Sequence, residues 1–140
     1  MMNEPLGRQV VFAGKAIQES FAGTLAEAGG SLATWVVLSA LSDVGIVSQA
    51  VLASHVHLEG ATITHHIDRL ESAGLVQRRL DPDDRRVRRL ELTPDGEDLH
   101  RRLLEAAKAF EQKAMVGVSE RDIAAVRRAL ARIQANLNAE

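Results

Sequence analysis

A change of period in the middle of the chain constrains the fold more than any other feature. Two six-residue β-prone runs, LVQRRL at 75–80 and VRRLEL at 87–92, are separated by DPDDRR. The proline and aspartates between them favour a turn, so the three pieces together predict a β-hairpin. Helical patterns lie on both sides. The fold is therefore expected to be helical with one hairpin inserted.

Helical periodicity marks four segments before the hairpin and two after it. They lie at 7–28, from Ser31 to the break DVGI at 43–46, at 49–56, at 61–73, from Thr93 to Gly117, and from Ser119 onward. Candidate N-caps precede four of them, and candidate glycine stops follow: Ser31, Ser48, Thr93 and Ser119, then Gly29-Gly30, Gly74 and Gly117. A short helix, a tight turn at 57–60, a second helix and a basic hairpin are typical of a winged helix-turn-helix.

The segment 61–73 is the expected recognition helix. At 100° per residue, Ile63, Ile67 and Leu70 share one side, which is predicted to be buried. The side chains predicted to meet a DNA major groove lie opposite or on the flank: Thr62, Thr64, His65 and Arg69. Threonine suits base edges or phosphates, and arginine suits guanine or phosphate. The alternative is an ordinary solvated helix face.

The hairpin at 75–92 is the expected wing. Between Arg69 and Thr93 the chain carries seven arginines and five acids, a local +2 in a chain whose net charge is −2. Arg85 and Arg86 at the tip are predicted to enter a minor groove, whose negative potential attracts arginine. Asp84 is expected to orient Arg86, whereas Arg88 and the other strand arginines are expected to hold phosphates or pair with acids. The alternative is a surface hairpin neutralised by its own charges.

The last helix carries a heptad seam that predicts dimerisation. Its apolar residues step by 3, 4, 3 and 4 positions: Ile123, Val126, Leu130, Ile133 and Leu137. Such a seam is too apolar for a lone surface helix, and a chain of 140 residues gains core by pairing with a second copy.

The sequence resembles the MarR (multiple antibiotic resistance regulator) family. LDPDDRRVRRLELTPDG is similar to that family's wing, whose Asp-x-Arg and Leu-Thr-x-x-Gly pattern is carried by Asp84, Arg86, Leu92, Thr93 and Gly96. ATITHHIDRLESAGLV resembles its recognition helix, and the resemblance covers about residues 31–96. The His-His pair at 65–66 departs from the arginine, serine or small residues common there, so the operator sequence is not transferable.

The resemblance implies a sequence-specific transcriptional regulator, with repression as the expected mode. It implies a single 140-residue domain in which 7–30 and 94–140 form a homodimer and 31–93 bind double-stranded DNA. Each subunit would contact half of a pseudo-palindromic operator. A small aromatic or anionic effector would enter a cleft between the dimerisation helices and the winged domain, and the protein would then release the DNA. Candidate lining residues are Phe12, Ile17, Phe21 and Trp35, for which the alternative is a place in the core.

Several classes are excluded or disfavoured. The chain has no cysteine, so disulfides, zinc–thiolate sites and thiol sensors are excluded. His55 and His57, and the pair His65-His66, lack the i, i+4 spacing of a helical metal site, so no metal or cofactor is expected. A metal-responsive regulator of the same fold remains an alternative, as does a dimeric interaction module without DNA binding.

Enzyme motifs are absent, since neither a glycine-rich phosphate loop nor a nucleophile elbow occurs in the sequence. No run approaches the roughly 18 apolar residues of a membrane span, and the first residues lack a signal pattern. The expectations are a protein that is not an enzyme, has no membrane partner and is cytoplasmic.

Overall fold

The structure is a computed structural model that describes residues 4–56 and 60–139, apart from the side chains of residues 60 and 61. The chain divides into two compact units, Met1–Phe110 and Glu111–Glu140.

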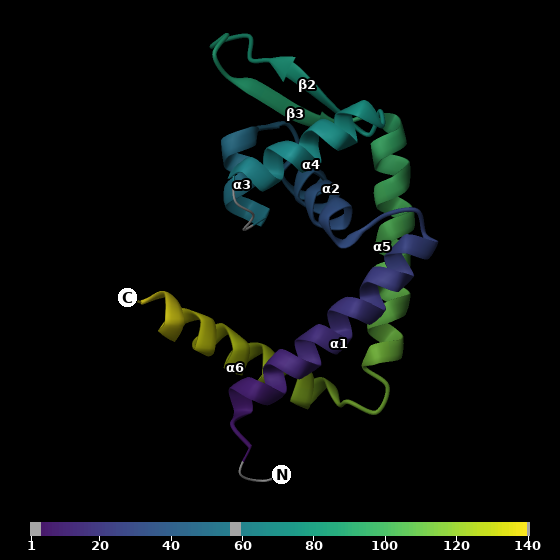
Figure 1. The fold of residues 1–140 in the computed structure, drawn as a ribbon, viewed down its shortest axis with the longest axis vertical. Helices are drawn as coiled ribbons and strands as arrows, with labels where there is room; N and C mark the ends of the chain where they lie inside the picture. The colour runs from purple at the N-terminus through teal and green to yellow at the C-terminus, as the bar shows by residue number, and fades with distance from the viewer. Residues whose placement is uncertain (1–3, 57–59, 140) are drawn as a thin grey trace. The chain divides into compact units, whose positions relative to one another are not determined.

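The elements follow the predicted order, with one addition (Figure 1). The first unit holds α1 (Leu6–Glu27), α2 (Leu32–Val44), β1 (Val47–Ser48), α3 (Gln49–Val56), α4 (Gly60–Ser72), β2 (Val76–Leu80), β3 (Arg88–Leu92) and most of α5 (Pro94–Ala114). The second unit holds the end of α5 and α6 (Glu120–Asn138). The turn predicted at 57–60 falls largely on residues 57–59, which lie outside the described residues. The predicted fold class, mainly α with a small β wing, is confirmed.

All four predicted N-caps are confirmed. The side-chain oxygens of Ser31, Ser48, Thr93 and Ser119 each accept a hydrogen bond from the backbone N–H three residues later, at 3.0–3.2 Å. These bonds satisfy N–H groups that a helix cannot pair internally. The end of α4 is likewise determined by neighbouring residues. Gly74 adopts φ +77°, and the Leu75 N–H donates a hydrogen bond to Leu70 O at 2.9 Å. Gly74 thus ends α4 and starts the wing.

The sheet has three strands in the order β1-β3-β2, one more than the sequence predicted. β2 and β3 form the predicted antiparallel hairpin, in which Arg78 lies opposite Leu90. The sequence analysis expected no strand between the break at 43–46 and the helix at 49–56, and so missed β1, where Val47 pairs with Leu90 and Ser48 with Arg89. Two residues are too short for an alternating pattern, and their partner strand lies about 40 residues away in sequence. Only tertiary contact makes this segment a strand.

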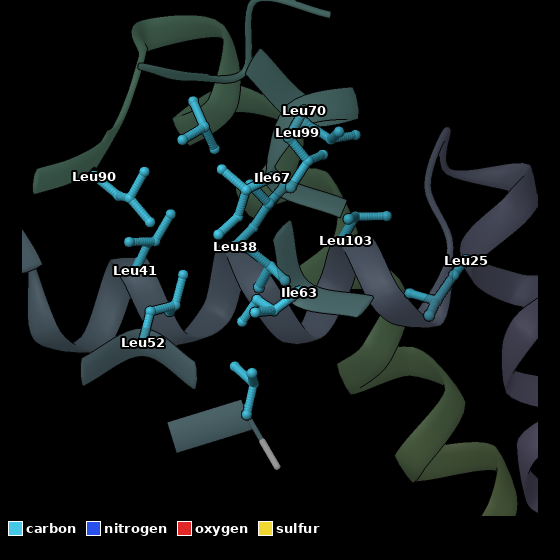
Figure 2. Packing of buried hydrophobic residues seen from close by; sticks show 13 residues of the cluster. Leu25, Leu38, Leu41, Leu52, Ile63, Ile67, Leu70, Leu90, Leu99 and Leu103 are labelled. Atoms are coloured by element: carbon cyan, nitrogen blue, oxygen red, sulfur yellow. The ribbon is translucent and has the colours of Figure 1, made fainter. Parts of the chain in front are cut away.

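The core of the first unit is aliphatic and gathers around α2 (Figure 2). Leu38 and Leu41 of α2 are buried among side chains from α3, α4, β3 and α5. On α4 the predicted inward residues are confirmed: Ile63, Ile67 and Leu70 are all buried. The same packing therefore determines which side of α4 remains exposed.

The first half of α1 is largely uncovered in the single chain. Val10, Phe12 and Ile17 are 38%, 56% and 48% exposed, whereas Leu25 at the end of the helix is fully buried. Among the described residues, no single helix is long and apolar enough to cross a membrane, and α1 and α2 pass that test only as a pair bent by 77°.

Gly96 in the first turn of α5 lies against the base of the wing. A Cβ added there would be 2.0 Å from the Leu75 carbonyl oxygen, so the backbone would have to move. Gly96→Ala is therefore expected to lower the free energy of unfolding by about 1–3 kcal/mol, as overpacking does. Thermal unfolding measures this. Gly14→Ala, where a Cβ meets nothing within 4 Å, should instead be neutral or stabilising, and equal behaviour of the two variants would contradict the packing argument.

Candidate nucleic-acid interface

Burial of one side of α4 leaves the predicted reading residues on the other. Thr62, His65 and Arg69 are exposed, as the helical wheel predicted. His66 is half-buried, and its ring lies 6.0 Å from that of His65. Threonine, histidine and arginine side chains here could donate to base edges or phosphates.

Thr64 has a second role that the wheel did not show. Its hydroxyl accepts a hydrogen bond from Nε2 of Gln49, the first residue of α3, at 2.7 Å. The bond links the two helices of the helix-turn-helix. Thr64 nevertheless stays exposed on the flank of α4, so its predicted DNA contact remains a prediction.

The wing tip, residues 81–87, is organised by its acids. Asp84 accepts hydrogen bonds from the Arg86 backbone N–H at 3.0 Å, from Nε at 3.1 Å and from Nη2 at 3.3 Å. The Arg86 side chain remains 91% exposed despite this pairing. The predicted orienting role of Asp84 fits this geometry, because the carboxylate holds the guanidinium while leaving it open to solvent.

Asp81 is an organising residue that sequence reasoning did not single out. It is 6% exposed, and its Oδ1 accepts the backbone N–H groups of Asp83 at 2.7 Å and Asp84 at 3.2 Å. Its Oδ2 accepts Nε of Arg89 at 2.6 Å. The Asp-Pro-Asp sequence could have predicted this role. An aspartate often stabilises a turn by accepting a hydrogen bond from the backbone N–H two residues later. Its burial was not predictable.

Three of the four strand arginines, Arg78, Arg79 and Arg89, pair with acids, which is one of the two outcomes expected for them. Arg79 Nε lies 2.5 Å from Glu91 Oε1, which Gln77 Nε2 also approaches. Arg78 donates to Asp68 and Glu71 of α4 at 2.7 and 2.8 Å. Burial by itself lowers the pKa of Arg78, but these hydrogen bonds and the two negative charges outweigh it and raise that pKa above its ordinary value.

Arg85 at the tip and Arg88 at the start of β3 differ from these three arginines. Both are exposed, and neither forms an ion pair within the part of the chain that the structure describes. Together with Arg86 they leave three guanidinium groups available at or beside the tip. A cluster of exposed arginines on a rigid loop is suited to an anionic partner with regular charge spacing.

The wing should lose its order in acid. Hydrogen bonds from the backbone of Asp83 and from Arg89 lower the pKa of Asp81, and the Arg86 side chain lowers that of Asp84. A lowered folded-state pKa means that the stabilisation is complete above the ordinary aspartate range, about 4, and is lost as the pH falls through the folded-state value.

We expect the NMR protection factor of the Asp83 amide, its exchange rate relative to the intrinsic rate at the same pH, to be high and constant at pH 5–7 and to fall below about pH 4. Asp81→Asn should remove this acid step and give a lower protection factor at pH 5–7. Asp98→Asn, which alters a surface pair on α5, serves as the control. A wild-type protection factor that does not change with pH would contradict the assignment.

The predicted effector residues lie in two different settings. Phe21, Trp35 and His100 form an aromatic cluster in which Trp35 stacks on His100 at 5.7 Å and Phe21 meets Trp35 edge-on at 6.4 Å. Phe12 and Ile17 lie on the exposed part of α1. None of the four lines the cavity of about 600 Å³ whose walls include Glu91, Glu97 and His100, but Trp35 lines a second cavity of about 300 Å³ together with His55. Their contact with an effector stays a prediction.

The described part of the chain contains no cluster of side chains that could bind a metal ion. Across residues 4–56 and 60–139, no three or more histidine or carboxylate side chains are arranged to hold an ion. His57, one of the histidines considered from the sequence, lies outside the described residues.

A recognition helix buried on one side, a three-stranded sheet and an arginine-bearing hairpin define a winged helix-turn-helix domain. Residues 31–87 match the model of the MarR family. The match of this stretch agrees with the resemblance seen in the wing and the recognition helix.

Two curated relatives are HTH-type transcriptional regulators of Bacillus subtilis (strain 168). YdgJ is 29% identical over 102 residues and YwoH is 31% identical over 88 residues. The matches cover 73% and 63% of this chain but only 62% and 64% of the relatives, so the chain spans less than two thirds of either relative. The relatives are regulators and not enzymes, in agreement with the sequence-based expectation.

Solved structures extend the similarity over the whole fold. Bordetella bronchiseptica BpsR, studied for regulation of its DNA binding by 6-hydroxynicotinic acid, has a TM-score of 0.87 at 26% identity, covering 100% of this chain and 98% of its own. A mutant of Escherichia coli MarR in complex with operator DNA has a TM-score of 0.85 at 20% identity, covering 92% of this chain and 93% of its own. The second likeness concerns the fold alone.

Proposed function

We propose that the protein is a sequence-specific DNA-binding transcriptional regulator. The observation that carries this proposal is the wing, in which the aspartates Asp81 and Asp84 hold a tip that exposes Arg85, Arg86 and Arg88. Hairpin stability does not require three exposed guanidinium groups, whereas a minor groove beside a major-groove helix does favour them. Base contacts would come from the exposed side and flank of α4, and the wing would supply affinity. The α4 residues proposed for these contacts are Thr62, Thr64, His65 and Arg69.

The regulator is proposed to act as a homodimer on a pseudo-palindromic operator. Val126, Leu130, Ile133 and Leu137 of α6 are 54%, 39%, 37% and 74% exposed in the single chain, which leaves the heptad seam without cover. Ile123, the first residue of that seam, is half-buried. A two-fold dimer would bury this seam against its copy and present two wings and two recognition helices to related half-sites.

Release by a small aromatic or anionic effector completes the proposal. An effector acts only if it binds one spacing of the DNA-binding lobes more tightly than another. The relative BpsR, whose DNA binding is regulated by 6-hydroxynicotinic acid, supports an aromatic acid as the first compound to assay. Repression is the proposed mode, because an operator-bound dimer needs only to occupy promoter DNA.

Fluorescence anisotropy across a salt series tests the function. The protein's own upstream DNA and a scrambled duplex of equal length would be titrated, and specific binding should fall steeply as salt rises because phosphate contacts release counterions. Binding to neither duplex at low salt would instead leave a dimeric interaction module. Equal binding to both would remove the claim of sequence specificity for that DNA.

Substitutions on α4 should separate specificity from affinity. His65→Ala and Thr62→Ala are each expected to change the preference between operator variants by about tenfold at one or two base pairs, as the loss of a base contact does. Binding to nonspecific DNA should change little. Competition titrations with a panel of single-base operator variants measure this. A uniform loss across the whole panel would show that these residues do not read bases.

A further inference from the structure

The ion pairs of Arg78 differ from the other ion pairs of the wing in what they join. Arg79–Glu91, Arg86–Asp84 and Arg89–Asp81 each join two residues of the hairpin itself. Arg78 instead reaches from β2 to α4, where Nη2 lies 2.7 Å from Asp68 Oδ1 and Nη1 lies 2.8 Å from Glu71 Oε1. Glu71 also accepts the Arg78 backbone N–H at 3.3 Å. One side chain therefore connects the two elements proposed to contact DNA.

The geometry of this connection is restrictive. Asp68 and Glu71 are three residues apart, so they are neighbours on one flank of the helix. The planar guanidinium spans both carboxylates with separate nitrogen atoms, which limits rotation as well as distance. The Arg78 side chain is 15% exposed, against 62% for Arg79 and 91% for Arg86. The guanidinium is thus largely shielded from solvent, while Asp68 and Glu71 remain 59% and 42% exposed.

Among the described residues, the hairpin is otherwise held at its base and, on the side of β3, by the pairing of β1 with Leu90 and Arg89. The base is pinned by Thr93, which donates its hydroxyl to Gly74 O at 2.6 Å and its N–H to Leu75 O at 3.1 Å. Val76 and Leu90 are buried in the core, but Leu80, further toward the tip, is 60% exposed. Apolar packing thus ends at the level of Arg78. The hairpin lies along α4 with its loop at the free end (Figure 1).

The tip of the hairpin lies far from its base, so a small rotation at the base moves the tip by a large distance. The tip, residues 81–87, begins about six residues after Leu75, which at about 3.3 Å a residue is roughly 20 Å. A pivot of about 10° at the base would displace the tip by about 3.5 Å over that length. A minor groove is only about 6 Å wide, so such a pivot would misplace an inserted arginine. A contact midway along the strand restricts the pivot most directly.

We propose that Arg78 is a positioning residue for DNA binding, which fixes the wing at one spacing from the recognition helix through Asp68 and Glu71. The inference rests on the proposed DNA-binding function. Arg78 itself faces the two carboxylates and is not counted among the DNA contacts. Its effect reaches DNA through Arg86 and the other exposed arginines of the wing.

The position of the wing can be measured without DNA. The chain contains no cysteine, so Ser72→Cys on α4 and Asp83→Cys at the tip can carry spin labels, with labelled protein diluted in unlabelled protein. The wild-type background should give one narrow distance distribution between these labels. Arg78→Met should broaden it at least twofold, while Arg79→Met, which removes the same charge from the adjacent residue, should leave it narrow. Arg78→Lys keeps the charge but cannot span both carboxylates, so it should also broaden the distribution.

The second test measures operator affinity in a double-mutant cycle between Arg78→Met and Arg86→Ala. Arg86→Ala should weaken operator binding at least tenfold in the wild-type and Arg79→Met backgrounds, but less than threefold when Arg78 is already methionine. Circular dichroism of each variant checks that it is folded. Two results would overturn the inference about Arg78 and leave the proposed DNA-binding function standing. One is an unchanged label distance distribution in Arg78→Met, and the other is an equal loss of operator affinity on Arg86→Ala in all three backgrounds. A wild-type protein that selects no operator would overturn the proposed function as well.

Discussion

Arg86→Ala should weaken operator binding strongly while leaving the dimer intact. The Arg86 guanidinium is held by Asp84 yet 91% exposed, so its substitution removes a pre-oriented cation without disturbing the core. Loss of one such DNA contact costs about 1–3 kcal/mol, and a symmetric dimer loses it twice. The expected fall in affinity is therefore at least about tenfold, measured by anisotropy at fixed salt.

Arg101→Ala provides the matched control for charge. Arg101 lies on α5, where it forms a surface pair with Asp98 at 3.1 Å, and it also loses one positive charge on substitution. Its operator affinity should stay within about twofold of the wild type, because exposed pairs contribute little. The slope of log affinity against log salt should become shallower for Arg86→Ala only. Equal affinities of Arg86→Ala and the wild type would remove the wing from the mechanism.

Leu130→Asp should convert the dimer to a monomer. Leu130 lies at the centre of the α6 seam and is 39% exposed in the single chain, so a partner helix would complete its burial. Burying a leucine contributes about 1.5–3 kcal/mol, and the two-fold axis repeats the loss. An aspartate adds the cost of a charge at an apolar contact. The dissociation constant should rise by at least about a hundredfold.

Sedimentation velocity decides this prediction, with the 15.2 kDa chain mass as the reference for the monomer. Ala131→Asp introduces the same charge one residue later, on an exposed position outside the seam, and should remain dimeric. Circular dichroism should confirm helical content in both variants. A Leu130→Asp protein that still sediments as a dimer would place the interface elsewhere, and the uncovered apolar residues of α1 would be examined next.

Much of the local structure was predictable because its causes are local. The caps at Ser31, Thr93 and Ser119 depend on a side-chain oxygen and an N–H three residues away. The stop at Gly74 depends on a backbone conformation that glycine adopts without strain. The buried side of α4 followed from its period, since Ile63 and Ile67 return to the same side of the helix.

The candidate interface was predictable in its residues but not in its connections. The arginines of the wing and the exposed side of α4 could be read from residue type and spacing, and the Asp84–Arg86 pair spans only two residues. Whether a given strand arginine meets an acid of its own hairpin or of α4 depends on how the two elements lie. Sequence reasoning therefore expected Arg78 either to hold a phosphate or to pair with an acid, and it did not identify the partners.

The sequence by itself determined the helices, their ends, the hairpin and the resemblance to the MarR family, because each follows from contacts within a few residues or from a motif. Tertiary structure alone decided that Val47 and Ser48 become a strand, since their partner on β3 is remote in sequence. It also decided that Asp81 is buried and that Arg78 joins β2 to α4. These outcomes depend on the packing of whole elements, which brings distant charges and backbone groups within hydrogen-bonding distance.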